Sequence, residues 1–181
     1  MNDPKSKELS SGTESSDTGA ELQASTVDYD IVALSMPIYY NREGDHDHNG
    51  MLFVLEANVP ILEYIEALAR QGSRPRPGVQ TPNLQTLFAE AAPRAQDIEV
   101  HLPLTPEQAR GPHPLVRPLV LRARLGDTVK VTLRNQIRDR DVGLHLVSGG
   151  YDVETSDGSH VGANPATLAG FGSTQIYTCV L

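Results

Sequence analysis

Two runs in the second half of the chain, at residues 119–124 and 129–134, alternate apolar and polar residues. The apolar positions are Leu119, Leu121 and Ala123 in the first run and Val129, Val131 and Leu133 in the second. Residues two apart on a strand share a face, so each run predicts a half-buried β-strand. Gly126 and Asp127 lie between the runs, and both residue types favour turns. The pattern therefore predicts two strands joined by a short turn.

Other short runs predict further strands. Residues 142–146 have apolar side chains at alternate positions, with His145 on the opposite face. Residues 174–180 form a last strand candidate. Residues 29–40 are rich in β-branched and aromatic side chains and residues 51–56 are mostly apolar, so we expect a hairpin or strand connection between them. Short strands at this spacing suit a β-sandwich better than a parallel α/β sheet.

Residues 58–91 have helical periodicity and form an insertion between the predicted strands. Asn58 can cap a first helix that has Pro60 in its first turn and ends near Arg70. The apolar stripe of this helix consists of Ile61, Leu62, Ile65, Leu68 and Ala69. A second helix is expected at residues 82–91, with an apolar face of Leu84, Leu87, Phe88 and Ala91. Both helices are expected to cover an open side of the sandwich.

The remaining segments set the limits of the domain. Residues 1–27 are rich in Ser, Thr, Asp and Glu without apolar periodicity, which predicts a disordered polar tail. Residues 28–181 are then one small domain, with a proline-rich extended linker at residues 102–118. The tail lacks the apolar core of a signal peptide, and no apolar run is long enough to cross a membrane. We therefore expect a cytoplasmic protein that has no membrane segment.

The charge of the chain argues against nucleic acid as a partner. The formal net charge is -8 and the pI is near 5.1. Phosphate backbones are bound by clustered basic side chains, which a chain of this charge does not favour.

Four motifs follow one another in the second half of the chain. They are G-D-x-V-x-V-x-x-x-N at residues 126–135, HLVSG at residues 145–149, the pair Asp157-Gly158, and G-x-x-x-x-Y at residues 172–177. Their order resembles that of multicopper oxidases of the ceruloplasmin and hephaestin type and of the large bacterial ones linked to manganese oxidation. Residues 28–56 also resemble the leader strands of the bacterial members. The resemblance implies a mainly β fold, a cupredoxin-like Greek-key β-sandwich with one or two peripheral helices.

The resemblance further implies copper as cofactor. Relatives of this type oxidise metal ions or phenolic compounds at one copper and reduce dioxygen at a three-copper cluster. The family's H-x-H pair would fall on His145 and Val147, and valine cannot ligate a metal. His145 is therefore the single copper ligand that the resemblance predicts here.

The cysteine count argues against a redox centre in this chain alone. A blue-copper centre needs a cysteine together with two histidines, whereas the one cysteine, Cys179, has no histidine after it. We therefore expect no independent oxidase activity. The chain ends within a strand candidate, and we interpret this as a frameshift or premature stop that leaves the cupredoxin-like domain incomplete.

Two alternatives stand beside the oxidase hypothesis. One is a non-catalytic metal-binding or partner-binding module, which would join a partner subunit or the remainder of a larger oxidase. The other is a truncated remnant whose unpaired strand edges favour aggregation.

Residues 45–56 match the spacing of a calcium loop. The matching positions are Asp45, Asp47, Asn49, Gly50 and Glu56. The flanking segments are predicted strands rather than helices, so a calcium-like site here would not be an EF-hand, and a solvated acidic turn is the alternative. The same segment contains His46 and His48, whose spacing could hold copper or zinc on an extended backbone.

Overall fold

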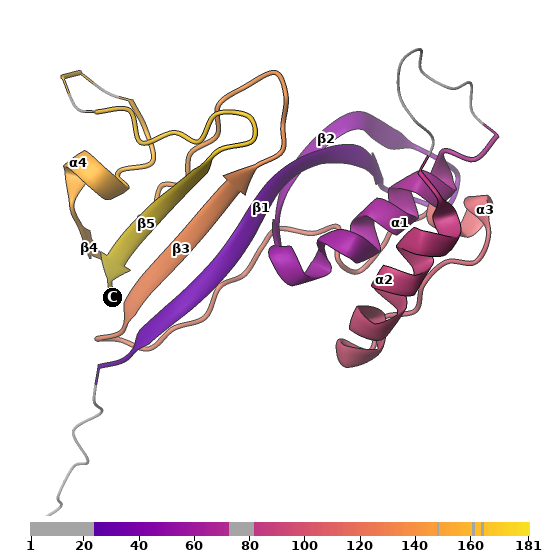
Figure 1. The fold of residues 1–181 in the computed structure, drawn as a ribbon, viewed down its shortest axis with the longest axis horizontal. Helices are drawn as coiled ribbons and strands as arrows, with labels where there is room; N and C mark the ends of the chain where they lie inside the picture. Colours follow the sequence, from indigo (N-terminus) through magenta and orange to yellow (C-terminus); the bar gives the residue numbers. More distant parts are fainter. Residues whose placement is uncertain (1–23, 73–81, 148, 161, 164) are drawn as a thin grey trace, which may run out of the picture.

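The frame of the molecule is a curled, five-stranded mixed sheet (Figure 1). The computed structural model describes residues 24–72, 82–147, 149–160, 162–163 and 165–181. The strands are β1 Thr26–Tyr39, β2 His46–Leu55, β3 Thr128–Asn135, β4 Gly150–Tyr151 and β5 Thr174–Val180, in the spatial order β2-β1-β3-β5-β4. β1 and β3 are parallel and the other neighbours are antiparallel. A β-rich fold was predicted, and this coarse prediction is confirmed.

β1 is long enough to pair with two neighbours along different parts of its length. Residues 26–33 pair with β3, and residues 31–39 pair with β2. The register with β2 shifts between Met36 and Ile38. Pro37 lies at this bulge, where the missing N–H of proline removes no regular ladder bond. The hairpin predicted around residues 40–50 therefore exists, with β2 beginning at His46.

Alternate residues of β1 face two separate hydrophobic cores. Val32, Leu34 and Met36 pack with the helices in a first core. Ile31 and Ala33 belong to a second core, which also contains Val129, Val131, Leu133, Ile137, Tyr177 and Cys179. The sheet thus has apolar side chains on both faces near its centre, which explains why four consecutive residues of β1 are buried.

The helices gather over the β1–β2 end of the sheet (Figure 1). They are α1 Val59–Ala69, α2 Leu84–Asp97 and α3 Pro106–Ala109, with a 3-10 turn, η1 Glu56–Asn58, before α1 and a short helix, α4 Val153–Ser156, in the later loops. The prediction of α1 is confirmed, although Asn58 makes no side-chain capping bond. The carbonyl end of α1 is bonded by Arg110, whose guanidinium donates to Ala69 O at 2.9 Å and to Gln71 O at 2.7 Å.

The second helix is longer than predicted. α2 begins at Leu84 after a capping Asn83, whose side-chain oxygen accepts from the main-chain N of Gln85. It continues beyond Ala91 to Asp97 with Pro93 inside it. Proline inside a helix costs one main-chain bond, and the burial of Ala91 and Ala95 against α1 offsets that cost.

Two of the predicted strands are wrong. Residues 119–124 are extended but belong to no strand, because side chains and not a neighbouring strand bond their main chain. The Tyr29 hydroxyl donates to Arg122 O and accepts from Arg122 N, and the Asp127 carboxylate accepts from Arg124 N. Residues 142–146 form only one isolated bridge, from Val142 to Ala169. The apolar alternation of both segments was still informative, because these side chains cover the second core.

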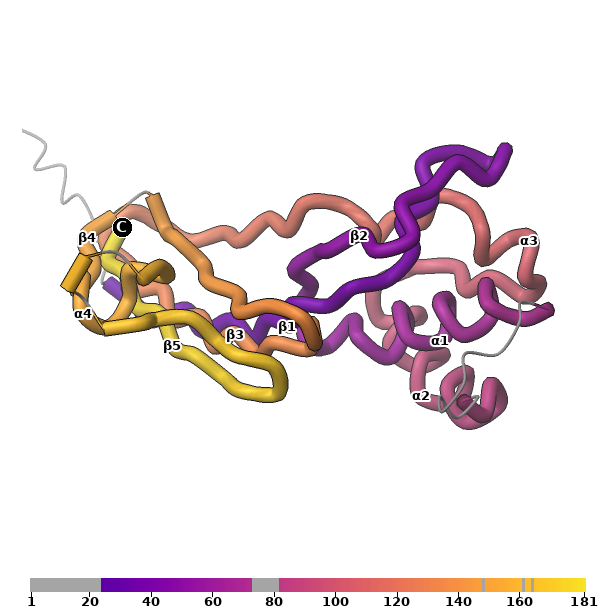
Figure 2. The backbone as a smooth tube through the Cα atoms, turned by 90° about the horizontal axis from the view of Figure 1, so that it is seen from above, coloured from indigo at the N-terminus to yellow at the C-terminus, as the bar shows by residue number. Residues whose placement is uncertain are grey.

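The linker and the tail also differ in detail from the prediction. Residues 102–118 are mostly extended but contain α3. From α3 the chain runs the length of the molecule back to the start of β3 (Figure 2). β1 begins at Thr26, within the segment predicted as tail, while residues 1–23 lie outside the described residues. No helix in the described part is both long and apolar enough to cross a membrane.

Candidate metal-binding histidines

His145 lies on the loop between β3 and β4, with half of its side chain exposed. Its Nδ1 is 2.8 Å from the main-chain O of Asp157, which can only accept, so Nδ1 carries the hydrogen. In the neutral ring the lone pair is then on Nε2. A metal-ligating histidine is commonly oriented by this kind of bond from its other ring nitrogen. His145 therefore has the tautomer of a ligand, although it is a single imidazole.

Asp157 is the polar centre of this loop. Its carboxylate accepts hydrogen bonds from the hydroxyls of Ser159 and Tyr151, and His145 Nδ1 lies 3.6 Å from Asp157 Oδ1. The Ser159 hydroxyl, with the Tyr151 hydroxyl and His145 as smaller causes, holds the pKa of Asp157 below its usual range. Burial, with the Asp157 bond as a lesser cause, raises the pKa of Tyr151. The carboxylate therefore stays ionised beside the imidazole at neutral pH.

Two glycines let Asp157-Gly158 come close to the start of HLVSG and to the two residues before it. A Cβ on Gly143 would overlap the carbonyl oxygen of Gly158, and a Cβ on Gly158 would overlap the carbonyl oxygen of Leu144 and lie 2.9 Å from the main-chain N of His145. Gly158 also has φ +74°, a conformation that favours glycine. Two of the motifs that carry the family resemblance thus touch through main-chain atoms.

The second position of the family's histidine pair does not contribute a ligand. Val147 is 86% exposed and belongs to neither core. Cys179 is buried in the second core, where it lies opposite Val129 on the neighbouring strand β3. Burial raises the pKa of its thiol, so the thiolate that copper would need is disfavoured.

The calcium-like set at residues 45–56 is not assembled into a site. β2 covers His46–Leu55, ten residues at about 3.3 Å each, so Asp45 and Glu56 flank opposite ends of a strand roughly 30 Å long. Glu56 is instead paired with Arg134 at 2.7 Å. Asp45 accepts from Asn41 Nδ2, and the main-chain N of Asn49 donates to the carboxylate of Asp47.

Gly50 has a different role from the one a calcium loop would give it. It lies within β2, buried, next to the bulge in β1. A Cβ there would overlap the side chain of Ile38. The glycine therefore allows close packing of the two strands and makes no turn.

His46 and His48 are brought together on one face of β2. His46 Nε2 lies 2.9 Å from His48 Nδ1, and the ring centroids are 4.2 Å apart in an edge-to-face arrangement. His46 Nδ1 is 2.7 Å from Gly44 O, and the His46 ring stacks on Tyr39 at 4.7 Å. Of the sequence-predicted ligands, these two are the pair whose nitrogens meet.

A further histidine, His113, is partly enclosed by residues far from it in the sequence. His113 Nδ1 accepts from the main-chain N of Leu115, while Nε2 is buried with no hydrogen-bond partner. Burial lowers the pKa of this imidazole. A cavity of about 10 Å³ beside it is the size of one water molecule. Its position among turn residues gave no sign of burial, because α1 and α3, which enclose it, come from other parts of the chain.

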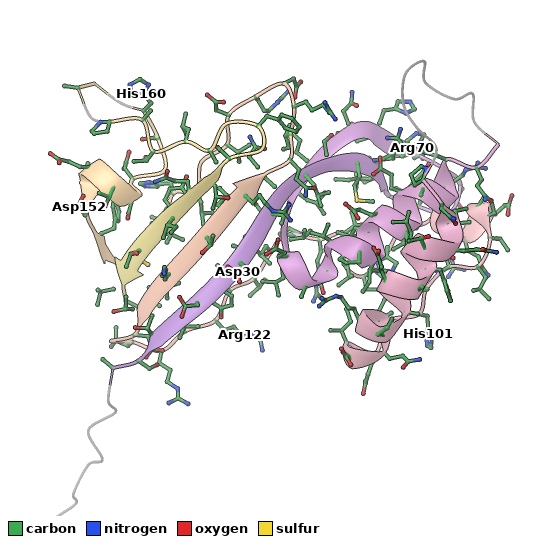
Figure 3. All side chains as sticks on the ribbon, viewed as in Figure 1. Asp30, Arg70, His101, Arg122, Asp152 and His160 are labelled. Carbon is green, nitrogen blue, oxygen red and sulfur yellow. The ribbon has the colours of Figure 1, made fainter. Side chains whose placement is uncertain are left out.

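An open groove of about 770 Å³ lies where β1 and the end of β3 meet η1, α1 and α2. Asp30, labelled on β1 in Figure 3, lines it together with Asp28, Glu56, Glu63, Arg94 and Arg134. Partial burial, helped by Glu90 and Glu66, raises the pKa of Glu63. The mixed charges of this groove single out no ligand class.

The described residues contain no group of three or more histidine, cysteine or acidic side chains arranged to hold a metal ion. The sequence matches no protein-family model and none of the curated proteins with which it was compared. The resemblance to multicopper oxidases is therefore a prediction that the four motifs carry.

Proposed function

We propose that this chain is a cupredoxin-like Greek-key domain of the multicopper oxidase type, which acts as a structural unit of a larger copper oxidase and does not itself turn over substrate. The observation that carries the proposal is the contact between the HLVSG and Asp157-Gly158 segments. Motifs that were recognised by their order along the chain also touch in space, because Gly158 lies against the main chain of His145 and His145 bonds Asp157. Such contact is expected where the motifs form one loop arrangement.

A third motif supports the same proposal. The asparagine that ends G-D-x-V-x-V-x-x-x-N is Asn135, fully buried at the end of β3. Its amide donates to Arg140 O and Ala169 O, and its oxygen accepts from the main-chain N of Ile137. One side chain thus bonds the strand that carries the first motif to the loops that precede the second and fourth motifs.

The ligands available here do not fit a copper centre of the family. A complete centre would supply electron transfer from substrate to dioxygen, which needs several coppers within reach of one another. Here His145 offers one imidazole nitrogen, Val147 offers none, and the Cys179 thiol is buried in the core. The proposal therefore assigns the missing ligands to a partner subunit or to the remainder of a larger oxidase, and it derives no catalytic step from this chain.

Visible absorption of the copper-loaded chain tests the proposal. Copper bound to a cysteine thiolate absorbs strongly in the visible region, and we expect no such band because Cys179 faces the second core. The matched control is Cys179→Ser, whose copper-loaded spectrum should equal that of the unaltered chain. An intense visible band that disappears in Cys179→Ser would contradict the proposal.

A further inference from the structure

The strongest unassigned feature is the pair His46 and His48, at the point where the hairpin enters β2. Side chains two apart on a strand share a face, so both rings project from the same side of β2. The pair lies outside both hydrophobic cores, and His48 is exposed. Its conformation is therefore not required for packing of the sheet.

The hydrogen bonds assign the tautomers of both rings. Gly44 O can only accept, so His46 Nδ1 carries a hydrogen and, in the neutral ring, His46 Nε2 is an acceptor. The 2.9 Å contact then requires His48 Nδ1 to donate. His46 thus presents its Nε2 lone pair toward His48, with its other nitrogen held by a main-chain carbonyl and its ring stacked on Tyr39. This bond from the second nitrogen is the support that metal-ligating histidines usually have.

The separation of the two nitrogens indicates which metals fit. Two adjacent ligands on a square-planar ion with bonds of about 2.0 Å are roughly 2.8–2.9 Å apart, whereas two ligands on a tetrahedral zinc ion are about 3.3 Å apart. The observed 2.9 Å matches the square-planar value. The spacing of the two nitrogens therefore suits the tetragonal ions copper(II) and nickel(II) once the rings turn toward the ion, whereas tetrahedral zinc requires a wider separation.

We propose that His46 Nε2 and His48 Nδ1 form a surface chelate for a tetragonal divalent metal ion, copper(II) above all. The metal replaces the hydrogen bond between the two rings and lies to one side of the line that joins their nitrogens, so each ring turns its lone pair toward it. His48 moves its hydrogen from Nδ1 to Nε2, so both imidazoles stay neutral and no proton is released. Water fills the other positions around the ion. The chelate is independent of His145 and of the proposed function.

Copper(II) titration, in the presence of glycine as a competing chelator, tests the proposal on the full chain. The unaltered chain is expected to bind one copper(II) at this site. His46→Ala and His48→Ala should each weaken binding by about tenfold or more, because loss of even an outer support of a metal ligand costs 10- to 100-fold. Far-UV circular dichroism of each variant without metal checks that the sheet is kept.

Control variants separate this site from other histidines. His101 lies at the helical end of the molecule and His160 on a loop at the opposite end (Figure 3), so His101→Ala, His160→Ala and the double variant should bind copper like the unaltered chain. Electron paramagnetic resonance of the copper complex should show coupling to two nitrogens, and to one nitrogen in either single variant.

Several outcomes would overturn the chelate. They are the absence of binding to the unaltered chain, undiminished binding in His46→Ala/His48→Ala, and an equal loss in the control variants. Coupling to two nitrogens that persists in both single variants would do so as well.

Discussion

Asp127 joins two parts of the chain with one carboxylate. Its Oδ1 accepts from the main-chain N and the hydroxyl of Ser25, and its Oδ2 accepts from the main-chain N of Arg124. The bond from Arg124, followed by those from Ser25, lowers the pKa of this carboxyl below its ordinary value. The ionised form is therefore the one that the fold uses to tie the start of β1 to the turn before β3.

Asp127→Asn is expected to lower the stability of the fold in a pH-dependent way. In asparagine an NH₂ group replaces one carboxylate oxygen. This NH₂ group can only donate, and it would face a main-chain N–H that also donates. Because the folded pKa is below the unfolded one, the carboxylate contributes stability above about pH 4, and this is lost as the pH falls through the folded pKa. Urea unfolding should therefore show a deficit at pH 7 that shrinks toward pH 3. An equal deficit at both pH values would contradict this assignment.

Asn135 makes a second prediction at the residue scale. Its replacement by alanine leaves Arg140 O and Ile137 N without their partner inside the protein, while Ala169 O keeps its bond from the main-chain N of Val142. We expect Asn135→Ala to cost about 2–4 kcal/mol of unfolding free energy, since each buried polar group left unpaired costs about 1–3 kcal/mol. The exposed Asn49 is the matched control, and Asn49→Ala should cost less than about 0.5 kcal/mol. Chemical denaturation measures both, and similar values for the two would refute the structural role of Asn135.

The contact between the two motif loops can be tested at the scale of elements. Gly143→Ala adds a methyl group against the Gly158 carbonyl oxygen, while Gly150→Ala, on β4, adds one in open space. Neither glycine has a positive φ, so the two variants differ in crowding and not in backbone strain. We expect Gly143→Ala to lose about 1–3 kcal/mol of stability and Gly150→Ala to be nearly neutral. A neutral Gly143→Ala in thermal unfolding would mean that the loops do not pack closely.

Elements with regular periodicity could be predicted from the sequence. β3, β5, α1 and the β1–β2 hairpin were found where alternation or a helical stripe indicated them. Apolar and polar residues alternate just as clearly at residues 119–124 and 142–146, but neither segment forms a regular strand. Alternation indicates which side chains are buried and does not indicate what the main chain bonds. Tyr29 bonds the first segment from 93 residues away along the chain, a contact that no local pattern contains.

The candidate site was predicted less well, for a related reason. The calcium-like spacing at residues 45–56 presupposes a loop that folds back, whereas His46–Leu55 is an extended strand that pairs with β1. The same strand geometry separates Asp45 from Glu56 and aligns His46 with His48. The residue types therefore indicated possible metal ligands. Whether the acidic residues or the two histidines come together depended on the conformation of the backbone between them.

At the scale of the whole molecule, the sheet has helices over one part and extended loops over another. The first core contains all of the buried residues of α1 and α2, and the second is closed by loop residues such as Leu119, Leu121 and Val142. The loop that bears His145 thus belongs to the part covered by loops, and the pair His46 and His48 lies on the hairpin that the helices border. His145 lies on a loop, whereas His46 and His48 lie on β2. Their contributions to copper binding can therefore be separated by mutation.

Oxygen consumption by the purified, copper-loaded chain with a ferrous or a phenolic substrate distinguishes a structural unit from an oxidase. We expect a rate no higher than that of the same concentration of free copper, because the described residues offer no group of three metal ligands. We also expect His145→Ala to leave the rate unchanged. Consumption clearly above the free-copper rate, lost in His145→Ala, would contradict the claim that this chain is a structural unit without its own oxidase centre.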